Sequence, residues 1–374
     1  MLPSGVAAPR RVLLTLDAVG GVWRYALDLA AALSARGTEC LLVGYGAPPK
    51  QEQRAELPKH GGCALVWSSA PLDWQAKEEA ELRPARDHLR DIIRDWRPDV
   101  LHLNLASQAA DLDRDIPVVV ASHSCIPTWW HTVRGGRLPM EWAWHRRRNR
   151  TGFAQADILI APSASHASAL RAIYGPLPHL AVVHNAVRPP TRPCVAREHF
   201  ILSVGRWLDD AKNGRVLDAA ASLSPWPVRL AGATQTSHDG GIELRNAESL
   251  GPLPASAVQA LMQRASIFAA PSVYEPFGLA VLEAAHAGAA LVLADIPTFR
   301  ELWDGAALFV QPDDPAAWAA AFGALANNAP RMERLALQAR KRARFFTVKR
   351  QTDGMFAAYA AAMSRHASRA RAAA

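Results

Sequence analysis

The sequence has few cysteines and no long uncharged hydrophobic run, and each shortage excludes a class of protein. Its 374 residues include four cysteines, with no CxxC pair or metal-ligand spacing among them. This excludes a disulfide framework and favours a reduced, cytoplasmic setting. The longest apolar stretch, residues 278–296, carries Glu283 and His286 and therefore predicts a helix followed by a strand, not a membrane span. No signal-peptide hydrophobic region is expected, because Arg10 and Arg11 lead directly into a short strand.

Half of the residues are hydrophobic, and a chain of this length can form two globular domains. Short apolar runs alternate with helical patterns along the whole chain, which predicts an α/β fold built on doubly wound parallel sheets. The expected strands are residues 11–16, 40–43, 99–104, 117–122, 157–161, 180–184, 200–204, 228–231, 266–270 and 290–294.

A proline-rich segment, residues 188–193, divides the strand-helix pattern into two halves. Its prolines cannot continue a helix or a central strand, so it is the best candidate for a hinge. We therefore expect one Rossmann-like domain over residues 1–190 and a second over residues 191–346. Residues 331–363 are predicted to be helical, and the last ten residues, 365–374, to be frayed or disordered.

Two glutamates eight residues apart lie at a predicted strand-to-helix junction. The segment from Glu275 to Glu283 reads EPFGLAVLE, in which a helix follows the loop that begins at Glu275. The amide N–H groups of Phe277, Gly278 and Leu279 at this helix start form an anion site. A nucleotide sugar fits the span, with the sugar at Glu275, the pyrophosphate on the helix start and the ribose at Glu283.

A second loop of the same domain carries two cations. Arg206 and Lys212 lie six residues apart after the strand predicted at residues 200–204. A guanidinium group forms paired hydrogen bonds and an ammonium group acts as a point charge, so together they can bracket a pyrophosphate. The alternative is a pair of solvated loop charges.

Three weaker candidates lie in loops. Gly20 and Gly21 allow the backbone to approach a ligand at a helix start, although tight turns use glycine routinely. His123 follows the strand predicted at residues 117–122, at the edge where doubly wound sheets bind ligands. Leu253 precedes another helix.

These motifs resemble those of the family-4 retaining glycosyltransferases, which have the GT-B architecture and an E-x7-E signature. The resemblance extends from Gly20 to about Phe346. It implies two Rossmann-like domains facing a deep cleft, the first for the acceptor and the second for the donor. It also implies a final helix at about residues 347–364 that crosses back to the first domain.

The resemblance also assigns roles to the residues that match. Glu275 and His123 are expected at the donor sugar and reaction centre, with Glu283 on the ribose hydroxyls. Arg206 and Lys212 neutralise the diphosphate together with the helix-start amides. Gly20 and Gly21 lie near the donor phosphate and acceptor, and Leu253 lies near the nucleobase.

The function expected from these residues is retaining transfer of a sugar from a UDP- or GDP-linked donor, without a metal or other cofactor. Asp111 and Asp113 form the Asp-x-Asp pair considered, but they lie in the first domain, away from the donor motifs. Two alternatives stay open: a glycoside phosphorylase that uses inorganic phosphate, and a non-catalytic sugar-nucleotide-binding protein. Sequence does not distinguish a nucleophilic Glu275 from one that stabilises charge electrostatically.

A basic and aromatic segment, residues 129–150, is the candidate for acceptor or membrane binding. It contains Trp129, Trp130, Arg134, Arg146 and Arg147 and contributes much of the net charge of +8. Arginine with tryptophan suits anionic surfaces, such as a phosphorylated acceptor or lipid headgroups at the inner membrane face. Nucleic acid is not expected, since no nucleic-acid-binding motif accompanies the segment. The acceptor, whether glycan, lipid-linked or small molecule, is not identified by the sequence, and a solvated basic helix is the alternative.

Overall fold

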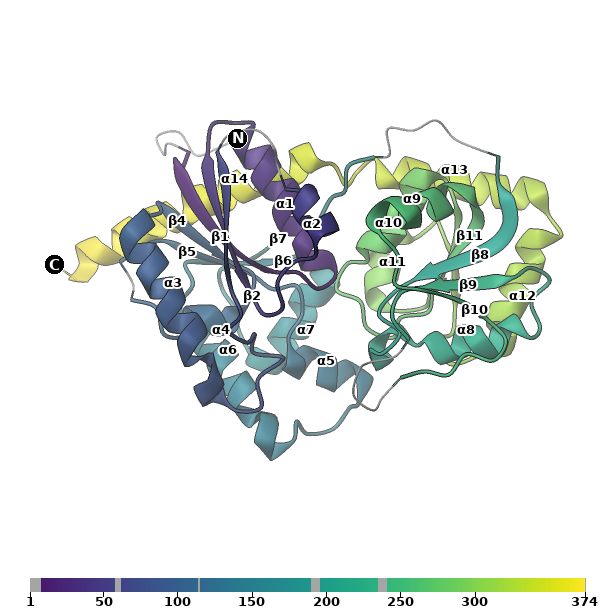
Figure 1. The fold of residues 1–374 in the computed structure, drawn as a ribbon, viewed down its shortest axis with the longest axis horizontal. Coiled ribbons are helices and arrows are strands. Elements are labelled where there is room, and N and C mark those ends of the chain that lie inside the picture. Colours follow the sequence, from purple (N-terminus) through teal and green to yellow (C-terminus); the bar gives the residue numbers. More distant parts are fainter. Residues whose placement is uncertain (1–7, 58–61, 114, 190–195, 235–240, 374) are drawn as a thin grey trace. The chain divides into compact units, whose positions relative to one another are not determined.

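The computed structural model describes residues 8–57, 62–113, 115–189, 196–234 and 241–373. It divides the chain into two compact units (Figure 1). The first unit contains Met1–Asn185 together with Val348–Ala374, and the second contains Ala186–Thr347. The chain thus leaves the first unit once and returns to it through its last helix, α14.

The first unit is built on a seven-stranded parallel sheet in the order β3-β2-β1-β4-β5-β6-β7. Its strands are β1 (Arg11–Asp17), β2 (Glu39–Tyr45), β3 (Cys63–Ser68), β4 (Val100–Leu103), β5 (Val118–Ala121), β6 (Ile158–Ala161) and β7 (Leu180–Val182). Its α-helices are α1 (Gly21–Ser34), α2 (Gln51–Ala55), α3 (Arg83–Trp96), α4 (Ala106–Ala109), α5 (Ile126–Val133), α6 (Ala143–Gln155), α7 (Ala164–Tyr174) and α14 (Val348–Ala373).

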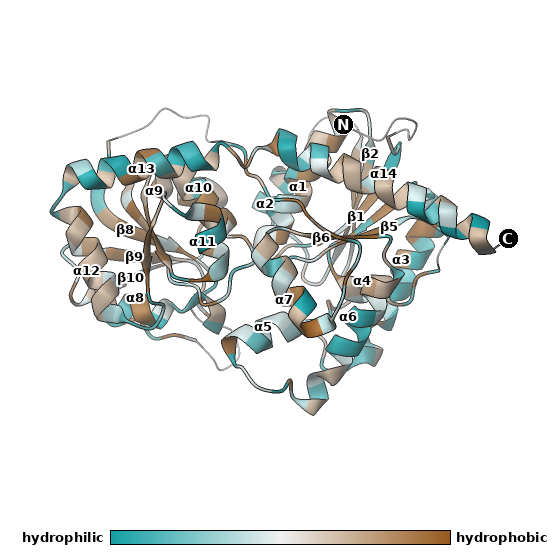
Figure 2. Cartoon of the chain, turned by 180° about the vertical axis from the view of Figure 1, so that it is seen from behind, coloured by the Kyte–Doolittle hydropathy of each residue, from teal (hydrophilic) through white to brown (hydrophobic). Residues whose placement is uncertain are grey.

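Helices cover both faces of this sheet. Successive strand residues point to opposite sides, and apolar side chains occur on both. On β1, Val12 and Leu14 join a buried cluster with α1 and α14, whereas Leu13 joins a second cluster with α3, α4, α6 and α7. The strands are therefore apolar on both faces, as parallel sheets require. Figure 2 shows the hydrophobic strands at the centre and hydrophilic colours on covering helices such as α6 and α13.

The second unit is a six-stranded parallel sheet in the order β10-β9-β8-β11-β12-β13, with a single buried cluster. Its strands are β8 (Glu198–Val204), β9 (Val228–Ala231), β10 (Glu248–Gly251), β11 (Ala265–Ala270), β12 (Ala290–Ala294) and β13 (Leu308–Val310). Its α-helices are α8 (Gly214–Ala221), α9 (Ala255–Arg264), α10 (Leu279–Ala287), α11 (Pro297–Trp303), α12 (Pro315–Ala326) and α13 (Ala329–Ala343).

Both sheets reverse their winding direction at one point, between β1 and β4 in the first and between β8 and β11 in the second. Loops at the carboxyl ends of the strands on either side of such a switch point diverge and leave room for a ligand. In the second unit these loops are residues 205–213 and residues 271–278. The sheet order alone therefore brings the two predicted donor motifs to one place.

The parallel α/β fold was predicted correctly, and one detail of the C-terminal region was wrong. The segment expected to be helical, residues 331–363, is helical in α13 and α14, with a short break between them. The tail expected to be disordered continues α14 to Ala373. Two of its side chains are tied to the first unit, because Arg365 contacts the His179 ring and Arg369 pairs with the buried carboxylate of Asp157. These contacts oppose fraying of the last turns.

The proline-rich segment expected to be a hinge lies largely outside the described residues, which omit 190–195. The two units meet along the chain at Asn185 and Ala186. The crossover helix expected at residues 347–364 corresponds to α14, which packs against α1 in the first unit.

Candidate active site

Lys212 and Glu275 meet at the switch point of the second sheet. Lys212 ends a 3₁₀ turn, Asp210–Lys212, in the loop after β8, and Glu275 lies in the loop after β11. The Lys212 Nζ donates to Glu275 Oε2 at 2.5 Å, with side-chain exposures of 25% and 18%. Two residues 63 positions apart thus form one charge pair at the carboxyl edge of the sheet.

Backbone and side-chain bonds hold these two loops together. The Val273 amide donates to the Ala211 carbonyl at 2.9 Å, which joins the loops directly. Asn213 adopts a left-handed conformation with φ of 51°, and its Nδ2 donates to the carbonyls of Pro271 and Pro312. Asn213 is a positioning residue that sequence analysis did not identify. Asparagine beside the lysine was the available signal, because asparagine tolerates positive φ better than most residues.

The helix α10 begins beside this pair without a side-chain cap. Its N-cap residue, Gly278, has a φ of 91°, and no side chain at that position accepts a hydrogen bond from the first turn. A Cβ at Gly278 would lie 3.1 Å from the Phe299 ring, so glycine meets both a conformational and a steric constraint. Phe277, which is buried, packs edge-on against Phe346 and fixes the approach of the loop.

The same helix places Glu283 on its partly exposed side, between the buried residues Leu282 and Ala284. Each turn of helix rises 5.4 Å, so Glu283 lies about one turn from the helix start. Leu253, in the loop before α9, is partly buried against the same core. These placements are compatible with the ribose and nucleobase contacts predicted for the two residues, which stay predictions.

Arg206 does not join the Lys212–Glu275 pair. Its guanidinium lies 3.5 Å from Asp209, and the side chain is 52% exposed. Next to it, Trp207 is buried and donates from its indole nitrogen to the Ala231 carbonyl. The loop is therefore fixed at Trp207 while Arg206 remains in solvent, where it can reorient towards an anion.

In the first unit, the predicted glycine pair begins helix α1. Gly20 is the N-cap residue, with a φ of 72° and no side-chain cap, and Gly21 is the first helical residue. The preceding turn is shaped by Asp17, whose Oδ1 accepts from the Val19 amide at 2.7 Å. As in α10, a glycine-initiated helix start lies at the switch point of its sheet.

His123 lies at the carboxyl edge of the first sheet, directly after β5 and the buried Ser122. Its Nε2 is 2.8 Å from Asn104 Oδ1, and the Tyr25 ring meets its ring edge-on at 4.4 Å between centroids. Burial lowers the pKa of His123 to about 4, because removal from water disfavours the imidazolium form. His123 is therefore a neutral side chain at physiological pH.

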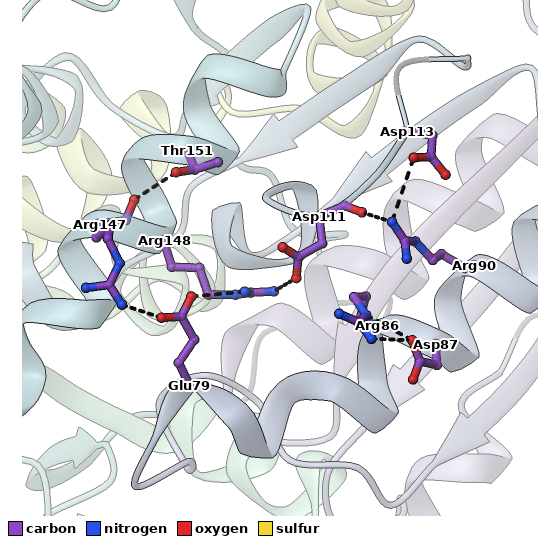
Figure 3. Close-up of polar contacts among 9 residues, drawn as sticks. All are labelled: Glu79, Arg86, Asp87, Arg90, Asp111, Asp113, Arg147, Arg148 and Thr151. Carbon is purple, nitrogen blue, oxygen red and sulfur yellow. Dashed lines mark hydrogen bonds and ion pairs between the residues drawn. The ribbon is translucent and has the colours of Figure 1, made fainter.

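Two arginines of the basic and aromatic segment form ion pairs with carboxylates from other parts of the first unit. Figure 3 shows Arg147 and Arg148 directed at Glu79, with Arg148 also pairing with Asp111 at 2.5 Å. Arg148 is only 8% exposed, so its charge is compensated inside the protein. Arg147 is more exposed but shares Glu79.

The other members of the segment lie on α5, at its C-terminal end and on α6, before and after a largely exposed loop. Trp130 packs edge-on against Trp142, and Arg134 lies over the Trp129 ring. Arg146 donates to the Ile173 carbonyl at 3.2 Å. Between them, Met140 is 90% exposed.

Within the described ranges, no group of three or more His, Cys, Asp or Glu side chains could hold a metal ion. Over the same residues, no helix is both long and apolar enough to cross a bilayer.

The chain matches two glycosyltransferase families in sequence. Residues 19–189 match Glycosyltransferase Family 4, and residues 198–328 match Glycosyl transferases group 1. The chain is also 27% identical to the glycogen synthase of Mycobacterium tuberculosis over 368 residues, which covers 87% of this chain and 86% of that protein.

Solved structures with the same fold include the sucrose-phosphate synthase of Thermosynechococcus elongatus. Its TM-score is 0.75 at 17% identity, over 92% of this chain and 97% of that one. An Anabaena protein in complex with UDP and glucose has a TM-score of 0.69 at 16% identity, over 93% and 98%. Two Rossmann-like units with these sequence matches define a glycosyltransferase of GT-B architecture.

Together these matches show that the chain is a glycosyltransferase, of the hexosyltransferase type that uses a nucleotide sugar.

The positioning role of Asn213 leads to the first testable prediction. Asn213→Ala should lower the free energy of unfolding of the second unit by about 2–4 kcal/mol. It removes two hydrogen bonds worth roughly 1 kcal/mol each and, at a further cost, replaces asparagine by a residue that tolerates positive φ less well. Asn213→Gly loses the same hydrogen bonds without that cost, so it should be the less damaging change in chemical denaturation. Equal stability of Asn213→Ala and the wild type would contradict the assignment.

Proposed function

We propose that the loops joined by Lys212 and Glu275 form the donor site of a transferase that moves a hexose from a UDP-sugar to an acceptor, with retention and without a metal. The observation that carries this proposal is the direct Lys212–Glu275 contact beside the uncapped start of α10. The complex of UDP and glucose with a protein of the same fold supports UDP over GDP. In this proposal the transferred sugar binds with its anomeric carbon near Glu275, and the diphosphate binds at the start of α10.

The diphosphate leaving group is stabilised by fixed positive charge. The N-terminus of α10 carries the positive end of the helix dipole, and its first amides have no intrahelical acceptors. Lys212 adds an ammonium group that the Asn213 contacts hold near this helix. Exposed Arg206 supplies a mobile guanidinium that can close on the phosphates. Charge developing on the departing oxygen is thus met by groups already in place, which is the arrangement that lowers a barrier most effectively.

Glu275 acts on the sugar side of the same bond. Its carboxylate orients the sugar hydroxyls and stabilises positive charge that develops at the anomeric carbon as the leaving group departs. Lys212 contacts this carboxylate and would also lie near the bound diphosphate, so it reduces the repulsion between the two anionic groups. We also propose that His123, a neutral side chain of the first unit, is a hydrogen-bond partner for a sugar hydroxyl.

Incubation with a panel of nucleotide sugars, with and without inorganic phosphate, tests the proposal. Release of UDP from a UDP-hexose, independent of added phosphate and with retained anomeric configuration in the product, is the expected result. Turnover that requires phosphate would establish a phosphorylase. Binding of UDP without turnover of any sugar, in the presence of a broad acceptor panel, would establish a non-catalytic sugar-nucleotide-binding protein.

The second prediction concerns Lys212 and Arg206, the two cations proposed to hold the diphosphate. Lys212→Ala should reduce turnover by roughly 100-fold, the scale of losing one preorganised stabilising group. Arg206→Ala should reduce it by about tenfold, because its exposed side chain must first be ordered. Arg215→Ala, which removes an exposed cation from the start of α8, is the matched control and should retain full activity. Wild-type turnover in both Lys212→Ala and Arg206→Ala would contradict the proposal that these residues stabilise the diphosphate.

The third prediction concerns metals. Because cations and a helix dipole hold the diphosphate, EDTA should leave the initial rate unchanged. Rates measured after exhaustive chelation, and again after adding back magnesium or manganese, give the comparison. Loss of activity with EDTA and recovery with manganese would overturn the metal-independent mechanism.

We further propose that the exposed part of the basic segment contacts anionic lipid at the inner membrane face, in an otherwise cytoplasmic enzyme. Arg134, Arg146 and the exposed Met140 support this, since arginine binds lipid phosphates and a thioether side chain can enter the interface. The compensated Arg148 is left out of the proposed surface.

The fourth prediction follows from that surface. Each arginine near an anionic membrane contributes about 1 kcal/mol, so changing Arg134, Arg137 and Arg146 to Ser should weaken binding to anionic vesicles at least tenfold. A control with Arg331, Arg334 and Arg340 changed to Ser on α13 loses the same charge elsewhere. Liposome flotation with and without anionic lipid measures the difference. If the wild-type protein stays in solution with both vesicles, the membrane proposal fails.

A further inference from the structure

A chain of hydrogen bonds connects His123 to the first sheet. His123 Nε2 lies 2.8 Å from Asn104 Oδ1, and the Asn104 backbone amide donates to Thr15 Oγ1 at 2.9 Å. The Thr15 hydroxyl then donates to Gln108 Oε1 at 2.7 Å. Asn104 also donates from its side-chain Nδ2 to the Thr15 carbonyl. The chain joins the carboxyl ends of β1 and β4, on either side of the switch point.

These contacts fix the orientation of the Asn104 amide. A backbone carbonyl can only accept, so the group facing Thr15 O must be the Nδ2 amino group. The remaining oxygen, Oδ1, therefore faces His123. An amide oxygen also only accepts, so Nε2 of His123 must carry a hydrogen. Asn104 is buried, with 3% of its surface exposed, which leaves it no alternative partner in solvent.

The surroundings of His123 keep the ring neutral. The titratable side chains around it are His102 on β4, His166 on α7 and Tyr25 on α1. Burial lowers the pKa of both His102 and His166 to about 3, with the nearby His123 ring as a smaller contribution in each case. Burial also raises the pKa of Tyr25, so its hydroxyl stays protonated. A neutral ring with hydrogen on Nε2 has its lone pair on Nδ1.

We propose that Asn104 is a positioning residue that holds His123 in its Nε2–H tautomer, so that Nδ1 accepts a hydrogen bond from a hydroxyl group of a bound sugar. This inference rests on the proposed role of His123 at the sugar. It assigns to Asn104 the selection of the His123 tautomer, in addition to its structural hydrogen bonds with Thr15. A merely structural asparagine would contribute to stability but leave the protonation of His123 unaffected.

The pH profile of Asn104→Asp tests this. A carboxylate against Nε2–H stabilises the imidazolium form and raises the pKa of His123 towards neutrality. Below the raised pKa both ring nitrogens carry hydrogen and Nδ1 can no longer accept. The kcat of Asn104→Asp should therefore be highest near pH 8.5 and fall as the pH decreases to 5.5. Over the same range, titration of His123 should have little effect on the kcat of the wild type.

Gln108→Glu is the matched control. It places the same amide-to-carboxylate change in the same hydrogen-bond chain, but on the residue that accepts from Thr15 and not from His123. Its kcat profile should follow the wild type. A flat profile in Asn104→Asp, or the same shift in Gln108→Glu, would overturn the proposal. Loss of kcat with little change in the donor KM in Asn104→Ala, roughly tenfold, is expected from loss of tautomer selection.

Nuclear magnetic resonance of the unmodified protein tests the tautomer without relying on activity. With ¹⁵N-labelled histidine, the ring signals absent from His123→Gln identify His123. The expected pattern is protonated Nε2 and unprotonated Nδ1 at pH 7, and an Nδ1–H pattern or an equal mixture would contradict the inference. If the wild type transfers no sugar from any nucleotide sugar, the proposed function fails. If it does transfer sugar and His123 shows the wrong tautomer, only the role of Asn104 fails.

Discussion

The Lys212–Glu275 ion pair is the interaction on which the proposed donor site depends. It joins two loops that are far apart in sequence and places a cation between a carboxylate and the N-terminus of α10. Without Lys212, an anionic diphosphate and the Glu275 carboxylate would repel each other at close range in a partly buried site, where charges interact more strongly than in water. In the proposed site, the lysine would therefore allow a dianionic leaving group to bind beside the Glu275 carboxylate.

The two units use the same topology for different chemistry. Both sheets switch direction once, and a helix initiated by glycine begins at each switch point, at Gly20 and at Gly278. In the second unit the surrounding side chains are charged and partly exposed, which suits a phosphate. In the first unit the polar groups are neutral and joined by hydrogen bonds around His123, which suits sugar hydroxyls.

Much of the fold was predictable from sequence because buried parallel strands are short, apolar and regularly separated by helices. The strands that sequence analysis missed were β3, β10 and β13, of which β3 and β10 are poorly buried. The charged candidates for the donor site could be selected from sequence for two reasons. Glu283 interrupts an otherwise apolar helix, where a charge requires a partner. Glu275, Arg206 and Lys212 lie in loops after predicted strands, where parallel sheets bind ligands.

What sequence could not provide was the pairing of side chains in space. The contact between Lys212 and Glu275 depends on strand order, and the neutralisation of Arg148 by Glu79 and Asp111 depends on how α6 packs. The amides of Asn213 and Asn104 were missed for a similar reason. Their importance comes from which carbonyls they contact, and neither contact leaves a pattern in the sequence.

The central claim is that the second unit recognises the diphosphate of a nucleotide sugar through Lys212 and the start of α10. Isothermal titration calorimetry of the full chain with uridine, UMP and UDP tests this most directly, because the three ligands differ only in phosphate content. The account predicts that affinity rises with each phosphate and that UDP binds at least 100-fold more tightly than uridine, since charge-assisted contacts contribute roughly 1.5–3 kcal/mol each. Equal affinity for the three ligands would contradict the account.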